Sequence, residues 1–171
     1  PTVPEYHYDP SSYETRVYQG FGHGDYDALL KFGPNIKDWP EIAPLGENLL
    51  LKVASYITDP VTTTDELIPS GETSSYRSNP LGLAEFTLSR KDPEYVGRAK
   101  AVQAEENARR AGAADAALLE KIHAVPGCEA LQWEDVQIAS TIFAVKPGDG
   151  SAREQAASCQ RVLGAGANIV N

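Results

Sequence analysis

The feature that most constrains the fold is a strand-like apolar run that leads through a short turn into a helix. Residues 141–145, Thr-Ile-Phe-Ala-Val, are typical of a buried strand. Pro147-Gly148-Asp149-Gly150 predicts a turn, and the residues from Ser151 to Leu163 predict a helix that Gly164 ends. A strand joined so closely to a helix is typical of the α/β class.

Ser151 stands at the beginning of this predicted helix, where two interpretations compete. The backbone N–H groups and the positive end of the helix dipole favour a carboxylate, a phosphate or a developing oxyanion beside Ser151. Arg153 would add a two-donor clamp for such an anion. Alternatively, Ser151 and Glu154 have the spacing of a capping box, in which each side chain satisfies a backbone N–H group. This segment alone leaves both interpretations open.

A second apolar run, residues 48–57, has the density of a central strand and stops at Asp59-Pro60. The polar segment from Thr62 to Asn79 is expected to be a loop at the end of this strand. Rigid scaffolds commonly present ligand-binding groups on loops of this kind. The segment is therefore a candidate for one side of a functional site.

Residues 93–125 predict two helices on the outside of the fold. Asp92 can cap the first helix, and Pro93 suits a first helical position. Leu118, Leu119 and Ile122 give the second helix an apolar face. Nearly all of this region is expected to be packing and solvated surface.

Two blocks of the sequence resemble motifs of the aconitase and isopropylmalate isomerase family. The first block is Thr62-Thr63-Thr64-Asp65-Glu66-Leu67-Ile68-Pro69-Ser70-Gly71 followed by Tyr76-Arg77-Ser78-Asn79, which is similar to the family's Thr-Thr-Asp-His-Ile-Ser…Gly…Phe-Arg. The second block, Gly150-Ser151-Ala152-Arg153-Glu154-Gln155-Ala156-Ala157, is similar to the family's Gly-Ser-Ser-Arg-Glu-His-Ala-Ala. Both motifs belong to the mobile, or swivel, domain of that family and occur here in its order. The resemblance favours a divergent aconitase-like hydratase over a housekeeping aconitase.

The resemblance covers roughly residues 48 to 90 and 138 to 171, and it implies a β/β/α swivel domain of the α/β class over residues 48–171. Strands near 48–57, 138–146 and 167–171 would form much of its sheet. Residues 93–125 would be a helical excursion, or insertion, in this domain. Residues 1–47 are poor in aliphatic runs and are expected to form an extended wrapping or linker segment.

The activity implied by the resemblance is that of a hydro-lyase, which dehydrates and rehydrates hydroxy di- or tricarboxylic acids. In this comparison Ser151 acts as the catalytic base, and Asp65 orients a neighbouring group or assists the leaving hydroxyl. Arg77 and Arg153 bind the substrate carboxylates as planar two-donor forks, a task that lysine performs less well. Because a free serine is a poor base, the helix N-terminus must stabilise its alkoxide.

Two departures from the family pattern keep other functions open. Ala152 stands where the family has a second serine, and Glu66 stands where it has a histidine. They favour an alternative in which the chain is a catalytically changed or inactive carboxylate-binding module with the same fold. A third interpretation is a structural or interaction domain in which the named residues are only caps and turns.

The family's iron–sulfur (4Fe-4S) cluster is held by three cysteines on other domains, and neither Cys128 nor Cys159 stands in a matching motif. We therefore expect no cofactor and no metal site in this chain, with a cluster possible on the remaining domains. Those domains, in the same or a companion chain, and a small carboxylic acid substrate are the expected partners. The chain starts at Pro1 and contains no methionine, so we expect it to be a portion of a longer polypeptide.

The formal net charge of −9 argues against a nucleic-acid partner. No apolar run approaches the length of a membrane-spanning helix, so no membrane partner is expected either. The two cysteines are too few and too widely spaced for a disulfide framework, which predicts reduced thiols. These features together predict a cytoplasmic location.

Overall fold

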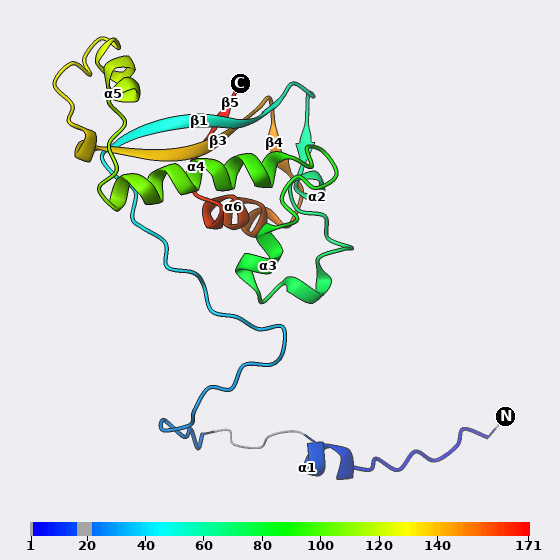
Figure 1. The fold of residues 1–171 in the computed structure, drawn as a ribbon. Coiled ribbons are helices and arrows are strands. Elements are labelled where there is room, and N and C mark those ends of the chain that lie inside the picture. Colours follow the sequence, from blue (N-terminus) through cyan, green and yellow to red (C-terminus); the bar gives the residue numbers. More distant parts are fainter. Residues whose placement is uncertain (1, 17–21) are drawn as a thin grey trace. The chain divides into compact units, whose positions relative to one another are not determined.

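The computed structural model describes residues 2–16 and 22–171. The chain divides into two compact units, Pro1–Lys31 and Phe32–Asn171. The first unit contains the short helix α1 (Ser11–Arg16), which has no buried residue. The predicted wrapping segment 1–47 includes residue 1 and residues 17–21, which lie outside the described residues. All elements discussed below belong to the second unit (Figure 1).

The second unit is built around a parallel sheet of three strands in the order β1-β3-β5 (Figure 1). Its strands are β1 (Asn48–Ile57), β3 (Val136–Ala144) and β5 (Ala165–Val170). A smaller parallel pair joins β2 (Thr62–Thr63) to β4 (Pro147–Asp149). Because parallel neighbours require crossover connections, helices separate the strands along the chain. The predicted α/β class is confirmed at this level.

Seven helical segments connect the strands of this unit. They are α2 (Thr64–Leu67), η1 (Ser74–Tyr76), α3 (Pro80–Ala84), α4 (Tyr95–Arg110), α5 (Ala116–His123), η2 (Trp133–Asp135) and α6 (Arg153–Val162). The expectation that residues 62–79 form only a loop is wrong, because β2, α2 and η1 lie within them. A capping box explains why α2 forms: Thr63 accepts from the Glu66 N–H at 3.1 Å, and Glu66 accepts from the Thr63 N–H at 2.7 Å.

The helix α4 covers the sheet and does not lie outside the fold. Tyr95 and Ala99 on one of its faces are completely buried, and the helix packs against β3 and β1. Figure 1 shows α4 and α6 on the same side of the sheet. The expected cap is also different, because Asp92 accepts from the Ser55 hydroxyl at 2.6 Å and from Arg98. The first predicted helix is thus part of the core layer.

The opposite face of the sheet carries an open row of apolar side chains. Tyr56, Phe143 and Ile169 are neighbours in register across β1, β3 and β5. The rings of Tyr56 and Phe143 stack with their centroids 4.6 Å apart. Tyr56 and Ile169 are both exposed.

Among the helices that the structure describes, none is both long and apolar enough to cross a membrane.

Candidate functional site

The N-terminus of α6 lies two residues later than the sequence pattern predicts. The helix begins at Arg153, and its N-cap is Ala152, which makes no side-chain cap. The expected turn at residues 147–150 is in part the strand β4, whose pairing with β2 keeps the chain extended. Gly150 then passes close to α2 with φ +148°, and a Cβ built there would lie 2.1 Å from the Thr64 hydroxyl oxygen. Only glycine fits this passage.

The capping-box interpretation of Ser151 is therefore wrong, because Ser151 precedes the N-cap. Its backbone carbonyl accepts from the Arg153 N–H at 3.0 Å. The first turn of an α-helix leaves its N–H groups without intrahelical partners, and here no side chain caps them. The positive end of the α6 dipole is thus open beside Ser151.

Arg77 reaches the same region from the first motif block. It directly follows η1, and Asn79 then caps α3 by accepting from the Gly82 N–H at 3.0 Å. Because α3 packs against α6, this turn lies next to the N-terminus of α6. A further bond ties the turn to the segment before β1, since the Lys37 N–H donates to the Ser78 carbonyl at 2.9 Å.

Three of the four predicted site residues line one cavity of about 520 Å³, which we call the α3–α6 cleft. Arg77 comes from the first motif block, and Ser151 and Arg153 come from the second. Asp65 is not part of the lining. The complete lining is Trp39, Arg77, Leu83, Ser151, Ala152, Arg153, Glu154, Gln155 and Ser158.

The charges in the cleft are poorly neutralised by the protein. Arg77 is exposed, and its side chain has no hydrogen-bond or ion-pair partner among the described residues. Arg153 uses its Nε atom to donate to the Gly150 carbonyl at 2.8 Å, which leaves its two terminal nitrogens without a described partner. Glu154 is the acidic residue of the lining. Two guanidinium groups against one carboxylate leave a local formal charge of +1 in a chain whose net charge is −9.

The Asp65 carboxylate is bound by Ser70 and Arg90, neither of which lines the cleft. It accepts from the backbone N–H and the hydroxyl of Ser70, both at 2.8 Å, and forms an ion pair with Arg90 at 3.2 Å. The hydrogen bonds from Ser70 hold the pKa of the Asp65 carboxyl below its ordinary value. The residue is connected to the cleft through its neighbour Thr64, which contacts Gly150. Asp65 is therefore an ionised group that fixes the α2 turn.

The two departures from the family motifs occupy different surroundings. Glu66 is held by its capping box and by Lys91, whose Nζ lies 3.0 Å away. The hydrogen bond from the Thr63 N–H, together with that from Lys91, holds the pKa of Glu66 below its ordinary value. Ala152, in contrast, lines the α3–α6 cleft. Only the second departure changes the surface that a ligand would touch.

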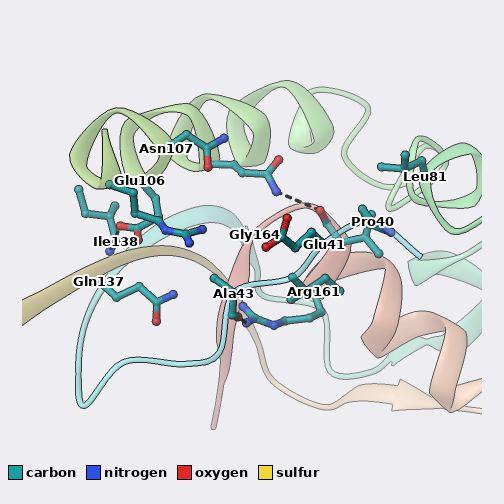
Figure 2. A pocket seen from close by; sticks show the side chains of 14 residues that line it. Pro40, Glu41, Ala43, Leu81, Glu106, Asn107, Gln137, Ile138, Arg161 and Gly164 are labelled. Carbon is teal, nitrogen blue, oxygen red and sulfur yellow. Dashed lines mark hydrogen bonds between the residues drawn. The ribbon is translucent and has the colours of Figure 1, made fainter. Parts of the chain in front are cut away.

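A second cavity, of about 150 Å³, lies between α4, β3 and the segment before β1, and we call it the α4–β3 cavity (Figure 2). Most of its polar groups are already paired. Glu106 accepts from Arg109 at 2.8 Å and from the Ile138 N–H at 2.9 Å, and Arg161 donates to the Ala43 carbonyl. These bonds join elements of the fold, which is typical of a structural seam. The lining is Pro40, Glu41, Ile42, Ala43, Leu81, Gln103, Glu106, Asn107, Arg110, Gln137, Ile138, Arg161, Val162 and Gly164.

Sequence reasoning missed several residues of the α3–α6 cleft. Trp39 comes from the segment predicted to be a linker, and Leu83 comes from a stretch for which no helix was predicted. Gln155 and Ser158 come from the helix predicted after Ser151, where neither was given a role in the site. Gln155 and Ser158 could have been found, because they follow Ser151 at intervals of about one and two helical turns. No sequence pattern indicated that Trp39 would line the cleft, since its neighbours show neither helical nor strand periodicity.

No group of three His, Cys, Asp or Glu side chains that could hold a metal ion is found among the residues that the structure describes. Cys128 and Cys159 are both free thiols. Burial raises the pKa of the Cys159 thiol to about 12, so it stays protonated at neutral pH and is a poor ligand. These two residues do not fit an iron–sulfur cluster.

Comparison with known proteins gives no match: no family model, no curated protein and no solved structure matches this chain. The interpretation of the site therefore depends on the two motif blocks and on the geometry of the cleft.

Proposed function

We propose that this chain is the swivel domain of an aconitase-like hydro-lyase that acts on hydroxy di- or tricarboxylic acids. One observation carries the proposal. Arg77 from the first motif block and the pair Ser151 and Arg153 from the second line the same cleft, although the blocks are far apart in the sequence. Two independent sequence resemblances are thus supported by a shared location.

The substrate carboxylates would be held by Arg77 and Arg153. Both guanidinium groups have N–H donors without a described protein partner, and both carry charge that the lining neutralises only in part. A planar guanidinium matches the two oxygens of a carboxylate, so each arginine can hold one carboxylate group. The uncapped first turn of α6 adds backbone donors on the same side.

Ser151 would act as the base that removes the proton beside a substrate carboxylate. The serine is not used as a cap, and the open end of the α6 dipole favours its alkoxide. The electron pair of the broken C–H bond would form the carbon–carbon double bond as the hydroxyl group leaves. Hydration would reverse these steps, with Ser151 returning the proton.

Asp65 has a positioning role in this proposal. Its bonds to Ser70 and Arg90 fix the turn after α2, and its neighbour Thr64 contacts Gly150 directly before Ser151. The carboxylate would thus keep the two motif blocks at a constant separation. This role corresponds to orienting a neighbouring group rather than to assisting the leaving hydroxyl.

The proposal implies partners beyond this chain. Further aconitase-type domains, in the same or a companion chain, would close the cleft, and a 4Fe-4S cluster bound there would supply the Lewis acid for the hydroxyl group. The row of Tyr56, Phe143 and Ile169, in which Tyr56 and Ile169 are exposed, supports contact with another domain, because apolar patches commonly mark such contacts. We place the protein in the cytoplasm.

A catalytically changed carboxylate-binding module is the second candidate. It is favoured by Ala152, which lines the cleft where the family has a hydroxyl group. Both candidates predict the same acid binding by Arg77 and Arg153. They differ in turnover: Ser151→Ala is expected to lower kcat by about 10²- to 10⁴-fold in the complete hydro-lyase, whereas a binding module shows no turnover to lose.

The binding claim can be tested with tricarballylate, a tricarboxylic acid without a hydroxyl group that can be eliminated. Isothermal titration calorimetry on this chain should show saturable binding, and Arg77→Gln and Arg153→Gln should each weaken it by about tenfold. Arg110→Gln is the matched control, because Arg110 lines the α4–β3 cavity and its loss changes the net charge equally. Its affinity should stay within about twofold of the wild type.

Equal weakening by Arg77→Gln and Arg110→Gln would show that the acid responds only to overall charge. Absence of saturable binding at millimolar concentrations would also exclude an acid site in the cleft. Either result rejects both the hydro-lyase and the binding-module candidates, since both depend on this contact.

A further inference from the structure

We propose that Trp39 determines the specificity of the α3–α6 cleft, and that the cleft selects acids with an apolar substituent beside their carboxylates. This inference depends on the proposed function, because it assumes that Arg77 and Arg153 hold the carboxylates. It adds a residue that neither motif block contains and a substrate class that the arginines alone do not define.

The lining of the cleft has a polar and an apolar portion. Arg77, Ser151 and Arg153 provide charge and a hydroxyl group, whereas Trp39, Leu83 and Ala152 provide apolar surface. Leu83 is 3% exposed and offers little of that surface. Trp39 is 57% exposed, so its indole is the largest apolar surface in the lining that a ligand can cover.

Hydrogen bonds fix the segment that carries Trp39 on both sides of the residue. On the N-terminal side, the Lys37 N–H donates to the Ser78 carbonyl at 2.9 Å, next to Arg77. On the C-terminal side, Arg161 donates to the Ala43 carbonyl, and the Gly46 N–H donates to the Gln137 side chain at 2.6 Å. Pro40 further restricts the backbone of Trp39. The backbone that carries Trp39 is therefore anchored beside the cleft before any ligand arrives.

The chemistry of this portion favours an alkyl or aryl group over a polar one. An apolar substituent that covers the indole removes apolar surface from water on both partners. A polar substituent would lose water there, and Ala152 provides no side-chain hydrogen bond in return. The cleft volume of about 520 Å³ leaves room for such a group. Ligand sites commonly measure about 300–1000 Å³.

The test compares succinate with 2-benzylsuccinate, which have the same two carboxylates and differ by one apolar substituent. Calorimetric titration of this chain should show that 2-benzylsuccinate binds about tenfold more tightly. Trp39→Ala should reduce this preference to less than about twofold, while the affinity for succinate stays within about twofold. Trp39→Phe should keep most of the preference, because it keeps an aromatic face.

Trp133→Phe is the matched control, since Trp133 lines a different cavity with Ala113 and Leu118. It should leave both affinities unchanged. Melting curves of all variants establish that the half-exposed Trp39 can be replaced without loss of the fold. A preference that survives Trp39→Ala, or one that Trp133→Phe removes equally, overturns the role of Trp39 and leaves the acid site intact. If wild-type chain binds neither acid, or if Arg77→Gln leaves succinate binding unchanged, the acid site itself fails and this inference with it.

Discussion

Two cavities of the second unit, the α4–β3 cavity and the α3–α6 cleft, contain arginines whose hydrogen bonds differ. In the α4–β3 cavity, Arg161 donates to the Ala43 and Ala165 carbonyl groups (Figure 2). Glu106 of the same lining pairs with Arg109, and Arg110 is exposed. In the α3–α6 cleft, Arg77 has no partner among the described residues, and Arg153 uses only its Nε atom. The first arrangement holds the fold together, whereas the second leaves donors for a ligand. The presence of arginine alone would not separate them.

The largest expected effect is on stability, and it comes from removing Glu106 from its bonds to Arg109 and Ile138. Glu106→Ala should lower the free energy of unfolding by about 3 kcal/mol, because it removes the carboxylate that pairs with the half-buried Arg109 and leaves the Ile138 N–H group without its acceptor. Arg77→Ala should change the same free energy by less than about 0.5 kcal/mol. Urea denaturation followed by circular dichroism measures both. Similar losses in the two variants would remove the distinction between the cavities.

The same glutamate predicts a dependence of stability on pH. Burial alone would raise the pKa of Glu106, but the hydrogen bonds from Arg109 and from the Ile138 N–H outweigh burial and hold this pKa below its ordinary value of 4.5. The unfolded chain then binds the proton more tightly, so the contribution to stability is complete above about pH 4.5 and is lost as the pH falls through the folded-state pKa. Denaturation at several pH values should show a smaller acid-induced loss for Glu106→Gln than for the wild type.

A smaller effect separates a true helix cap from a residue that only resembles one. Thr63→Ala should cost about 1 kcal/mol, because Thr63 caps α2 in a complete capping box. Ser151→Ala should cost less than about 0.3 kcal/mol, because Ser151 lies before the N-cap of α6. Thermal melting of the two variants provides the comparison. A full cap-sized loss on Ser151→Ala would restore the capping interpretation and weaken its role as a base.

The smallest expected effect tests whether the charge of the α3–α6 cleft controls acid binding. Glu154→Gln removes the carboxylate from the lining of the cleft and should tighten tricarballylate binding by about threefold. Glu120→Gln on the exposed side of α5 changes the net charge equally and serves as the control. Titrations at low and moderate salt should show the gain shrinking as ionic strength rises. If both variants gain affinity equally, the local charge of the cleft does not control binding.

The strands were the most predictable part of the fold. The apolar run over residues 48–57 corresponds to β1, and the runs near 138–146 and 167–171 correspond to β3 and β5 within about three residues. Buried parallel strands require continuous apolar sequences, so their signal is local. The parallel order β1-β3-β5 was beyond sequence reasoning, because it depends on contacts between distant segments.

The site was predictable only where the motifs carried it. Arg77, Ser151 and Arg153 meet in one cleft as the two blocks suggest, whereas Asp65 faces Ser70 and Arg90. The predicted start of α6 was wrong, because the Ser-x-x-Glu pattern of a cap also fits a chain that leaves β4 at Asp149 and becomes helical only at Arg153. Trp39 was missed because only long-range hydrogen bonds place its segment.

The pairing of the strands also orders the events of folding. Ser140 of β3 pairs with Ala165, 25 positions later, whereas Asn48 of β1 pairs with Val136, 88 positions later. Closing the longer loop costs about 1 kcal/mol more in chain entropy, so β3, α6 and β5 should associate before β1 joins them. The wall of the cleft with Ser151 and Arg153 would then form first. The wall with Arg77 lies 74 positions before Ser151 in the chain, so it would be added in a later step.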